Sequence, residues 1–264
     1  MRKFLIFAIL LLIIAAFAAP VSAVRYGQPD NGEHPYVGVI VFFNPDGSPS
    51  HRCTGTMISA RVMLTAAHCS ELNGAAMVWF YENEADVRAA GYPRSGGYTG
   101  QAVAHPNWTG ALTIPNTWDV GLVILDQAPN VGSAPLAGAG YLDTLSTARG
   151  QQNVSFEVVG YGLQAVKPKE SALVSRLQAD VQLVNLNSAL AGGYNLHTTN
   201  NPGNGTGGGG TCFGDSGGAI FHEGQIVAVN SFVLNSNCAG ASFGYRTDRT
   251  EILNWIYGYV NQFG

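Results

Sequence analysis

Thr211-Cys212-Phe213-Gly214-Asp215-Ser216-Gly217-Gly218 is the stretch that decides the fold of this 264-residue chain. A serine bracketed by glycines can stand on a tight turn with its hydroxyl exposed. The backbone N–H groups of Gly214 and Ser216 can then point into one small space, as an oxyanion hole requires. Gly, Asp and Ser are also common in ordinary turns, so this stretch needs partners elsewhere to indicate catalysis.

Gly214 to Gly218 also fits the nucleophile elbow of α/β-hydrolases. That fold places a helix after the serine, then an acid, then a histidine far downstream. Here residues 219–229 predict a strand, a turn centred on Gly224 and a second strand. The only histidine after Ser216 is His222, six positions on. The order and the context exclude the α/β-hydrolase fold.

Two candidate partners for Ser216 lie upstream. His68 follows the short apolar stretch Leu64-Thr65-Ala66-Ala67, and Asp119 begins the apolar stretch 120–125. A nucleophilic serine needs an imidazole to take its proton, and the imidazole needs a carboxylate to fix its tautomer. The chain order His, Asp, Ser is the chymotrypsin order. Together the three residues predict nucleophilic catalysis.

These motifs resemble the chymotrypsin family of secreted, trypsin-like serine peptidases. The resemblance extends over most of the chain after residue 23 and includes Gly55-Thr56-Met57-Ile58, His105-Pro106-Asn107-Trp108, Gly160-Tyr161-Gly162, Ser231-Phe232-Val233 and Asn254-Trp255-Ile256. It implies an all-β fold of two packed six-stranded antiparallel β-barrels with a C-terminal helix. Two departures are Tyr161, where the family has tryptophan, and the absence of the middle disulfides that many members carry.

The resemblance implies a role for each site residue. Ser216 would be the nucleophile, His68 the general base and Asp119 the group that orients His68. The N–H groups of Gly214 and Ser216 would bind the oxyanion, and Ser231 would support Asp119 from behind. The expected substrate-binding residues are Gly210, Thr211, Phe213, Ser231, Phe232, Val233 and Gly244.

The N-terminus predicts a signal peptide at residues 1–23, with basic Arg2 and Lys3, an apolar run from Phe4 to Ala19 and a small-residue cleavage site. The apolar run is shorter than the ~18 residues of a membrane span. Cleavage would free Val24. By resemblance, the Val24 amino group would pair with Asp215 and open the oxyanion hole without a separate zymogen step; the alternative is that residues 24–31 form a tail or a further propeptide.

Hydrophobic patterning predicts two sets of strands in the mature chain, which the resemblance implies are the two barrels. Residues 24–128 would form the first barrel, which carries His68 and Asp119. Residues 129–140 would cross to the second barrel, which spans residues 141–248 and carries Ser216. Residues 249–264 would form the C-terminal helix. The expected strands are 36–43, 53–58, 62–66, 77–81, 101–105, 120–125, 154–160, 177–184, 218–221, 225–232 and 241–246, with one further strand left unplaced. Ile252, Trp255, Ile256 and Tyr259 recur at helical spacing, with Asp248 or Thr250 as the expected cap.

Four cysteines in a secreted chain predict disulfides, and three pairings are open. The resemblance implies Cys53 with Cys69 and Cys212 with Cys238. Each of these bridges would close a local loop, worth about 3 kcal/mol. The alternative is a zinc site built from the two cysteines of the first pair with His51 and His68.

Specificity is predicted from what the pocket lacks. By resemblance, Gly210 stands at the pocket floor, where members that prefer Lys or Arg carry an aspartate. Val233 and Gly244 would form opposite walls, and the branched Val233 would narrow the mouth. Small or medium aliphatic P1 residues are therefore expected, although one methylene gives only about 1 to 3 kcal/mol of discrimination.

The formal net charge of −4, without a Lys or Arg cluster, argues against nucleic acid and anionic membranes as partners. We expect a monomer that uses no metal or cofactor and that has no membrane contact after signal cleavage. Its expected partners are peptide or protein substrates and, in addition, protein inhibitors. The alternatives are a catalytically silent binding or regulatory homologue, and an esterase or narrow processing peptidase that uses the same three residues.

Overall fold

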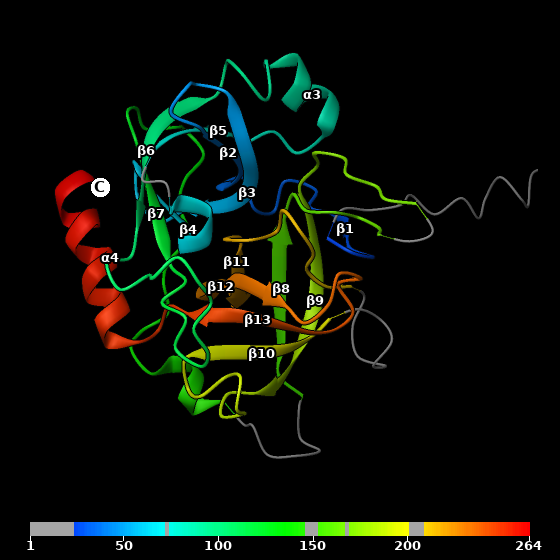
Figure 1. Ribbon diagram of the computed structural model, residues 1–264, viewed down its shortest axis with the longest axis vertical. Coiled ribbons are helices and arrows are strands. Elements are labelled where there is room, and N and C mark those ends of the chain that lie inside the picture. The colour runs from blue at the N-terminus through cyan, green and yellow to red at the C-terminus, as the bar shows by residue number, and fades with distance from the viewer. Residues whose placement is uncertain (1–23, 72–73, 146–152, 167–168, 201–208) are drawn as a thin grey trace, which may run out of the picture.

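The computed structural model describes residues 24–71, 74–145, 153–166, 169–200 and 209–264. They form two antiparallel β-barrels, one after the other in the chain, and a C-terminal helix. Figure 1 shows the first barrel in the upper half of the view and the second in the lower half. The all-β fold predicted from the sequence is thus confirmed. The predicted signal peptide lies outside the described residues.

The first barrel closes because its strands pair in a ring, in the order β2-β3-β4-β7-β6-β5 and back to β2. The strands are β2 (Val37–Phe43), β3 (Pro49–Met57), β4 (Val62–Thr65), β5 (Ala75–Trp79), β6 (Tyr98–Ala104) and β7 (Gly121–Leu125). Strand β2 is rich in Val, Ile and Phe, which suit a pleated backbone. Its alternate residues Ile40 and Phe42 fill the barrel, while Val39 and Val41 belong to the apolar cluster that joins the two barrels and the C-terminal helix.

The second barrel is a ring in the order β8-β9-β10-β13-β12-β11, closed by the pairing of β11 with β8. Its strands are β8 (Ser155–Gly160), β9 (Leu177–Asn185), β10 (Asn195–Asn200), β11 (Ala219–His222), β12 (Gln225–Val233) and β13 (Gly240–Arg246). The short strand β1 (Gln28–Pro29) adds to the outer edge of β9. Strand β10 is the one left unplaced by the sequence analysis, because Asn-Leu-His-Thr-Thr-Asn has no alternating apolar pattern.

Buried apolar side chains hold the two barrels together. One cluster fills each barrel, and a third joins them with the C-terminal helix, including Trp79 from the first barrel, Phe221 from the second and Ile256 from the helix. The crossing segment bonds to both units: Ala134 N–H donates to Met57 of β3, and Ala137 N–H donates to Ile226 of β12. The crossing segment therefore ties the two barrels to each other.

The C-terminal helix α4 (Thr250–Phe263) lies along one side of the first barrel in Figure 1. Ile252 and Ile256 of its predicted apolar face are fully buried. The prediction that Asp248 or Thr250 caps the helix is wrong, since no side chain caps it. The carboxylate of Asp248 instead accepts the N–H of Leu142 and pairs with Arg246.

Three short helical elements of the described residues were not expected from the sequence, and one of them, α2 (Ala67–Ser70), carries His68. Helix α3 (Glu84–Ala89) begins after Asn83, whose side chain accepts the N–H of Asp86. A 3-10 helix, η1 (Tyr141–Thr144), opens the segment after the crossing. Of the helices in the described residues, none is both long and apolar enough to span a membrane.

Candidate active site

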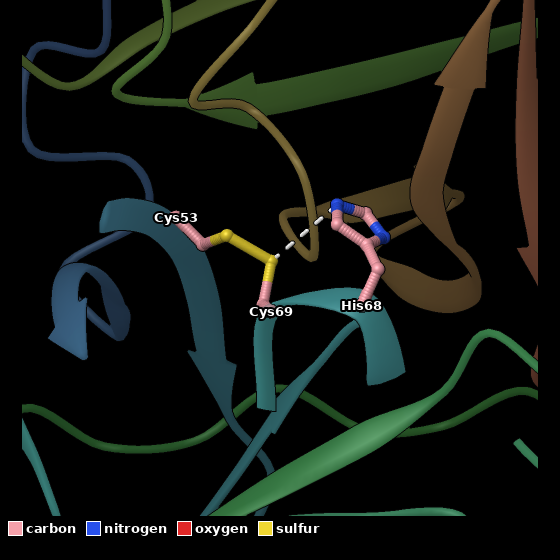
Figure 2. Close-up of side chains that lie close together, drawn as sticks. All are labelled: Cys53, His68 and Cys69. Atoms are coloured by element: carbon pink, nitrogen blue, oxygen red, sulfur yellow. Dashed lines mark hydrogen bonds between the residues drawn. A yellow bond between two sulfur atoms is a disulfide. The ribbon is translucent and has the colours of Figure 1, made fainter. Parts of the chain in front are cut away.

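His68 stands on the short helix α2 (Ala67–Ser70), directly after β4. The disulfide between Cys53 of β3 and Cys69 pins this helix to the first barrel, as predicted. Figure 2 shows the imidazole of His68 beside this disulfide, with Nε2 3.6 Å from Cys69 Sγ. The backbone of His68 is thus fixed by the residue that follows it.

Asp119 is placed by an unusual backbone at Trp118. This residue has φ of +52°, a left-handed conformation that is costly for a bulky side chain. Its indole stacks on His105 with ring centroids 4.9 Å apart, and the N–H of Val120 donates to the Trp118 carbonyl. The next residue, Asp119, is fully buried.

The Asp119 carboxylate binds His68 with both oxygens. Oδ2 lies 2.8 Å from His68 Nδ1, and Oδ1 accepts the backbone N–H of His68 at 2.8 Å. The hydroxyl of Ser231 donates to Oδ2 at 2.5 Å. Burial alone would lower the pKa of His68, but the charge and hydrogen bond of Asp119 raise it. The ring is therefore held as the tautomer that carries its proton on Nδ1 and leaves Nε2 able to accept.

Ser216 stands on a turn with two unused donors. The N–H groups of Asp215, Gly217 and Gly218 all donate to backbone carbonyls. Nothing in the described part of the chain accepts the N–H groups of Gly214 and Ser216, the two donors expected for the oxyanion hole. Gly214 has φ of +97°, which glycine adopts at no steric cost.

Thr54 of β3 ties this turn to the first barrel, a contact that the sequence did not reveal. Its backbone N–H donates to the Ser216 carbonyl at 2.9 Å, and its hydroxyl donates to the Gly214 carbonyl at 2.8 Å. The same hydroxyl accepts the N–H of Tyr161. One buried threonine thus sets the turn of the second barrel against the first.

His68 and Ser216 both line one cleft of about 540 Å³. No hydrogen bond joins the Ser216 hydroxyl to the imidazole within the residues that the structure covers. Such contacts are often long in enzymes without substrate and tighten in the complex. The arrangement can support proton transfer from the serine to His68 once the hydroxyl and Nε2 come within hydrogen-bond distance.

Asp215 is fully buried between Gly160 and Gly162, where a Cβ on either glycine would collide with its carboxylate. Its oxygens accept the N–H groups of Gly162 and Cys212 at 2.8 Å. Burial raises the pKa of Asp215 to about 7, although these two hydrogen bonds oppose the shift. The Gly-Tyr-Gly motif therefore provides the space for this carboxylate.

Val24 is buried against the second barrel, in the same cluster as Leu142 and Ala179. Here its nitrogen belongs to the peptide bond with Ala23, so it carries no charge. Within the described residues Asp215 has no ion pair. The ion pair between Val24 and Asp215 thus stays a prediction for a chain that begins at Val24.

Most residues expected to bind substrate line the cleft, namely Thr211, Phe213, Ser231, Phe232 and Val233. Gly210 and Gly244 do not line it. A Cβ on Gly210 would collide with the side chain of Asn200, and one on Gly244 would meet Ile220 and Ala228. Gly244 therefore faces the interior of the second barrel instead of forming the wall opposite Val233.

Further lining residues were missed by the sequence analysis. They are Glu71, Trp108, Gly110, Ala111, Leu112 and Asn230. Trp108 belongs to a motif noted in the sequence, and its indole N–H donates to Glu71 at 3.3 Å. The direction in which such a loop folds has no sequence signal, so its place over the cleft could not be predicted.

The zinc alternative meets a chemical obstacle. In the described residues the one trio of ligand-type atoms found close together is that of Cys53, His68 and Cys69 (Figure 2). The two sulfurs are bonded to each other, so neither is a thiolate that could bind zinc. The second disulfide, Cys212 with Cys238, also has the predicted pairing.

Comparisons with known proteins agree with this geometry. The family model described as Trypsin matches residues 24–256. Trypsin alpha of Drosophila melanogaster is 28% identical over 222 residues, which cover 81% of this chain and 80% of the relative. Brachyurin of Leptuca pugilator is 30% identical over 208 residues, which cover 77% of this chain and 85% of the relative.

Two solved structures show the shared fold. HL collagenase matches with a TM-score of 0.66 and 17% identity, over 90% of this chain and 99% of that chain. Human heparin binding protein matches with a TM-score of 0.62 and 22% identity, over 91% and 96%.

Proposed function

Because this chain belongs to the trypsin family of serine peptidases, we propose that it is an active, secreted serine endopeptidase that forms an acyl-enzyme on Ser216. The observation that carries the proposal is the double contact of Asp119 with His68 in the cleft that also holds Ser216. A scaffold that only binds other proteins would not need this arrangement. Peptides and proteins are the substrate class of the family.

In the proposed mechanism, His68 Nε2 takes the proton of the Ser216 hydroxyl as its oxygen attacks the scissile carbonyl. Asp119 keeps the ring oriented and stabilises the imidazolium. The oxyanion accepts hydrogen bonds from the unused N–H groups of Gly214 and Ser216. His68 then donates its proton to the leaving amine, and water, activated by the same imidazole, releases the acyl group and restores the serine.

We extend the proposal to activation. Signal cleavage after Ala23 would give Val24 a free amino group, which would move to Asp215 and pair with it. The buried carboxylate, which has no ion pair in the described residues, supports this step. A buried charge that gains a well-bonded partner is stabilised, whereas losing one partner typically costs about 3 to 5 kcal/mol. N-terminal sequencing of active protein should begin at Val24.

The proposed P1 residue is small or medium and uncharged. Val233 lines the cleft, where its branched side chain would narrow it. The one carboxylate among the described lining residues, Glu71, already accepts the indole N–H of Trp108. A small or medium aliphatic P1 residue, as expected from the sequence, meets both of these limits.

Hydrolysis of a peptide library by the purified protein tests the proposal, with Ser216→Ala as the control. Cleavage should be lost in the variant apart from a residual rate. Cleavage that persists at the wild-type rate in Ser216→Ala would contradict it, as would a folded wild-type protein that hydrolyses esters but no peptide.

A further inference from the structure

Asn230 of β12 lines the cleft and has an unsatisfied side chain. The residue is only 3% exposed. Neither its Nδ2 nor its Oδ1 has a hydrogen-bond partner in the described part of the chain. Buried side-chain amides are nearly always paired, so an asparagine with both groups unused indicates a ligand or water that completes it.

The strand register shows where this side chain points. The backbone of Asn230 is already bonded to the serine turn, donating to Gly218 and accepting from Gly217. Across the ladder Asn230 faces Gly244, and a Cβ there would meet Ile220 and Ala228 inside the second barrel. Because cross-strand partners share a face, the Asn230 side chain lies on this inner face. Unlike Gly244, Asn230 also lines the cleft, so it stands where the inner end of the cleft meets the barrel interior.

Besides the apolar Ile220 and Ala228, this face of the barrel carries polar, uncharged side chains. The hydroxyl groups of Thr211 and Ser242 lie 2.7 Å apart. Thr198 pairs with Ser242 across β10 and β13, and its hydroxyl has no partner among the described residues. These four residues, Thr198, Thr211, Asn230 and Ser242, are each at most 3% exposed, and we call them the polar wall.

We propose that the polar wall, through Asn230, selects a P1 side chain that both donates and accepts hydrogen bonds, with Asn or Gln as the best fit. The carboxamide of P1 would donate to Asn230 Oδ1 and accept from Asn230 Nδ2, which satisfies both groups at once. A carboxylate could use only the donor, and an aliphatic P1 would leave both groups buried and unpaired. The inference rests on the proposed acylation of Ser216 and replaces the aliphatic preference while keeping the size limit set by Val233.

Isosteric substrates test the inference. Peptides that differ only at P1, Asn against Leu and Gln against Met, change the hydrogen-bonding groups at nearly constant size. In wild-type protein kcat/KM should be at least about tenfold higher for the amide of each pair, because sites with buried polar groups reject analogues that leave them unpaired. Asn230→Leu should reverse the order. Asn261→Leu, on the exposed face of α4, is the matched control and should keep the wild-type ratio.

Two outcomes overturn the inference. If wild-type protein that reacts with a fluorophosphonate cleaves after Leu as fast as after Asn, the polar wall does not read P1, while the proposed function stands. If the folded protein neither reacts with the reagent nor cleaves any peptide, the proposed function fails and the inference fails with it. Should Asn230→Leu not fold, the ratios of the wild-type protein decide.

Discussion

Asp119 grips His68 at two points, with Oδ2 2.8 Å from the ring Nδ1 and Oδ1 2.8 Å from the backbone nitrogen. The carboxylate therefore fixes both the position of the residue and the tautomer of its ring. A serine hydroxyl from the second barrel, that of Ser231, supports the same carboxylate.

Asp119→Asn should lower kcat by about 10⁴-fold, because an amide can donate to Nδ1 and so stabilise the wrong tautomer. Ser231→Ala removes one hydrogen bond to a charged group, so it should cost only about 10- to 100-fold, from about 1.5 to 3 kcal/mol. Steady-state kinetics on one peptide substrate measures both. Asp119→Asn with more than a tenth of wild-type activity would contradict the role given to the carboxylate.

Asp215 should make stability depend on pH in a chain that continues through Val24. Burial raises the pKa of Asp215 to about 7, whereas in the unfolded chain an aspartate titrates near ~4. The folded state then binds the extra proton, so the free energy of unfolding falls as pH rises from ~4 to ~7. Denaturant unfolding across this range should show the fall, and Asp215→Asn should remove it.

A chain that begins at Val24 should lack this fall, because an adjacent ammonium group stabilises the ionised carboxylate. Identical pH profiles for the two forms would contradict the ion pair of Val24 with Asp215.

His34 should stabilise the fold below neutral pH. Its Nδ1 lies 2.6 Å from Asp30 Oδ1 and its Nε2 3.2 Å from Glu157 Oε2. Burial alone would lower the pKa of His34, but the two carboxylates raise it to about 9. The contribution of His34 to the free energy of unfolding, on the order of 3 kcal/mol, is thus complete below the pKa of ~6.5 that a histidine has in the unfolded chain. It is lost as the pH rises through about 9.

The variant His34→Gln tests this, since it keeps a hydrogen-bonding side chain without the charge. The difference in unfolding free energy between the two proteins should shrink between pH 6.5 and 9. A difference that is constant over this range would show that His34 does not titrate there.

The disulfide of Cys53 with Cys69 should support both stability and activity. The two cysteines are 16 residues apart, and a loop of that size corresponds to about 3 kcal/mol. Replacing both by Ala should lower the melting temperature and also kcat, since Cys69 directly follows His68. If the variant loses stability but keeps the wild-type kcat, measured well below its melting temperature, the disulfide is not needed to place His68.

The sequence predicted the fold and the cleft best where chemistry needs particular residue types. His68, Asp119 and Ser216 lie in motifs whose order and spacing are restrictive, so they could be found without a structure. Strand β10 could not, because its six mostly polar residues become a strand through pairing with β9 and β13. Local propensity gave no sign of it.

Other features depend on contacts between distant residues. Asp248 is expected to cap the helix from its position, yet its carboxylate pairs with Arg246 and accepts the N–H of Leu142. The resemblance puts Gly244 opposite Val233, and only its contacts with Ile220 and Ala228 show that it faces the interior of the second barrel. Asn230 itself has no motif, since an asparagine within an apolar strand becomes informative only when its partners are known to be missing.

The most direct test of the central claim is the intact mass of the folded, signal-cleaved protein after reaction with a small fluorophosphonate, beside Ser216→Ala. An assembled nucleophile predicts one adduct on the wild-type protein and none on the variant. A folded wild-type protein that begins at Val24 and takes up no adduct would contradict the account, as would an equal adduct on both.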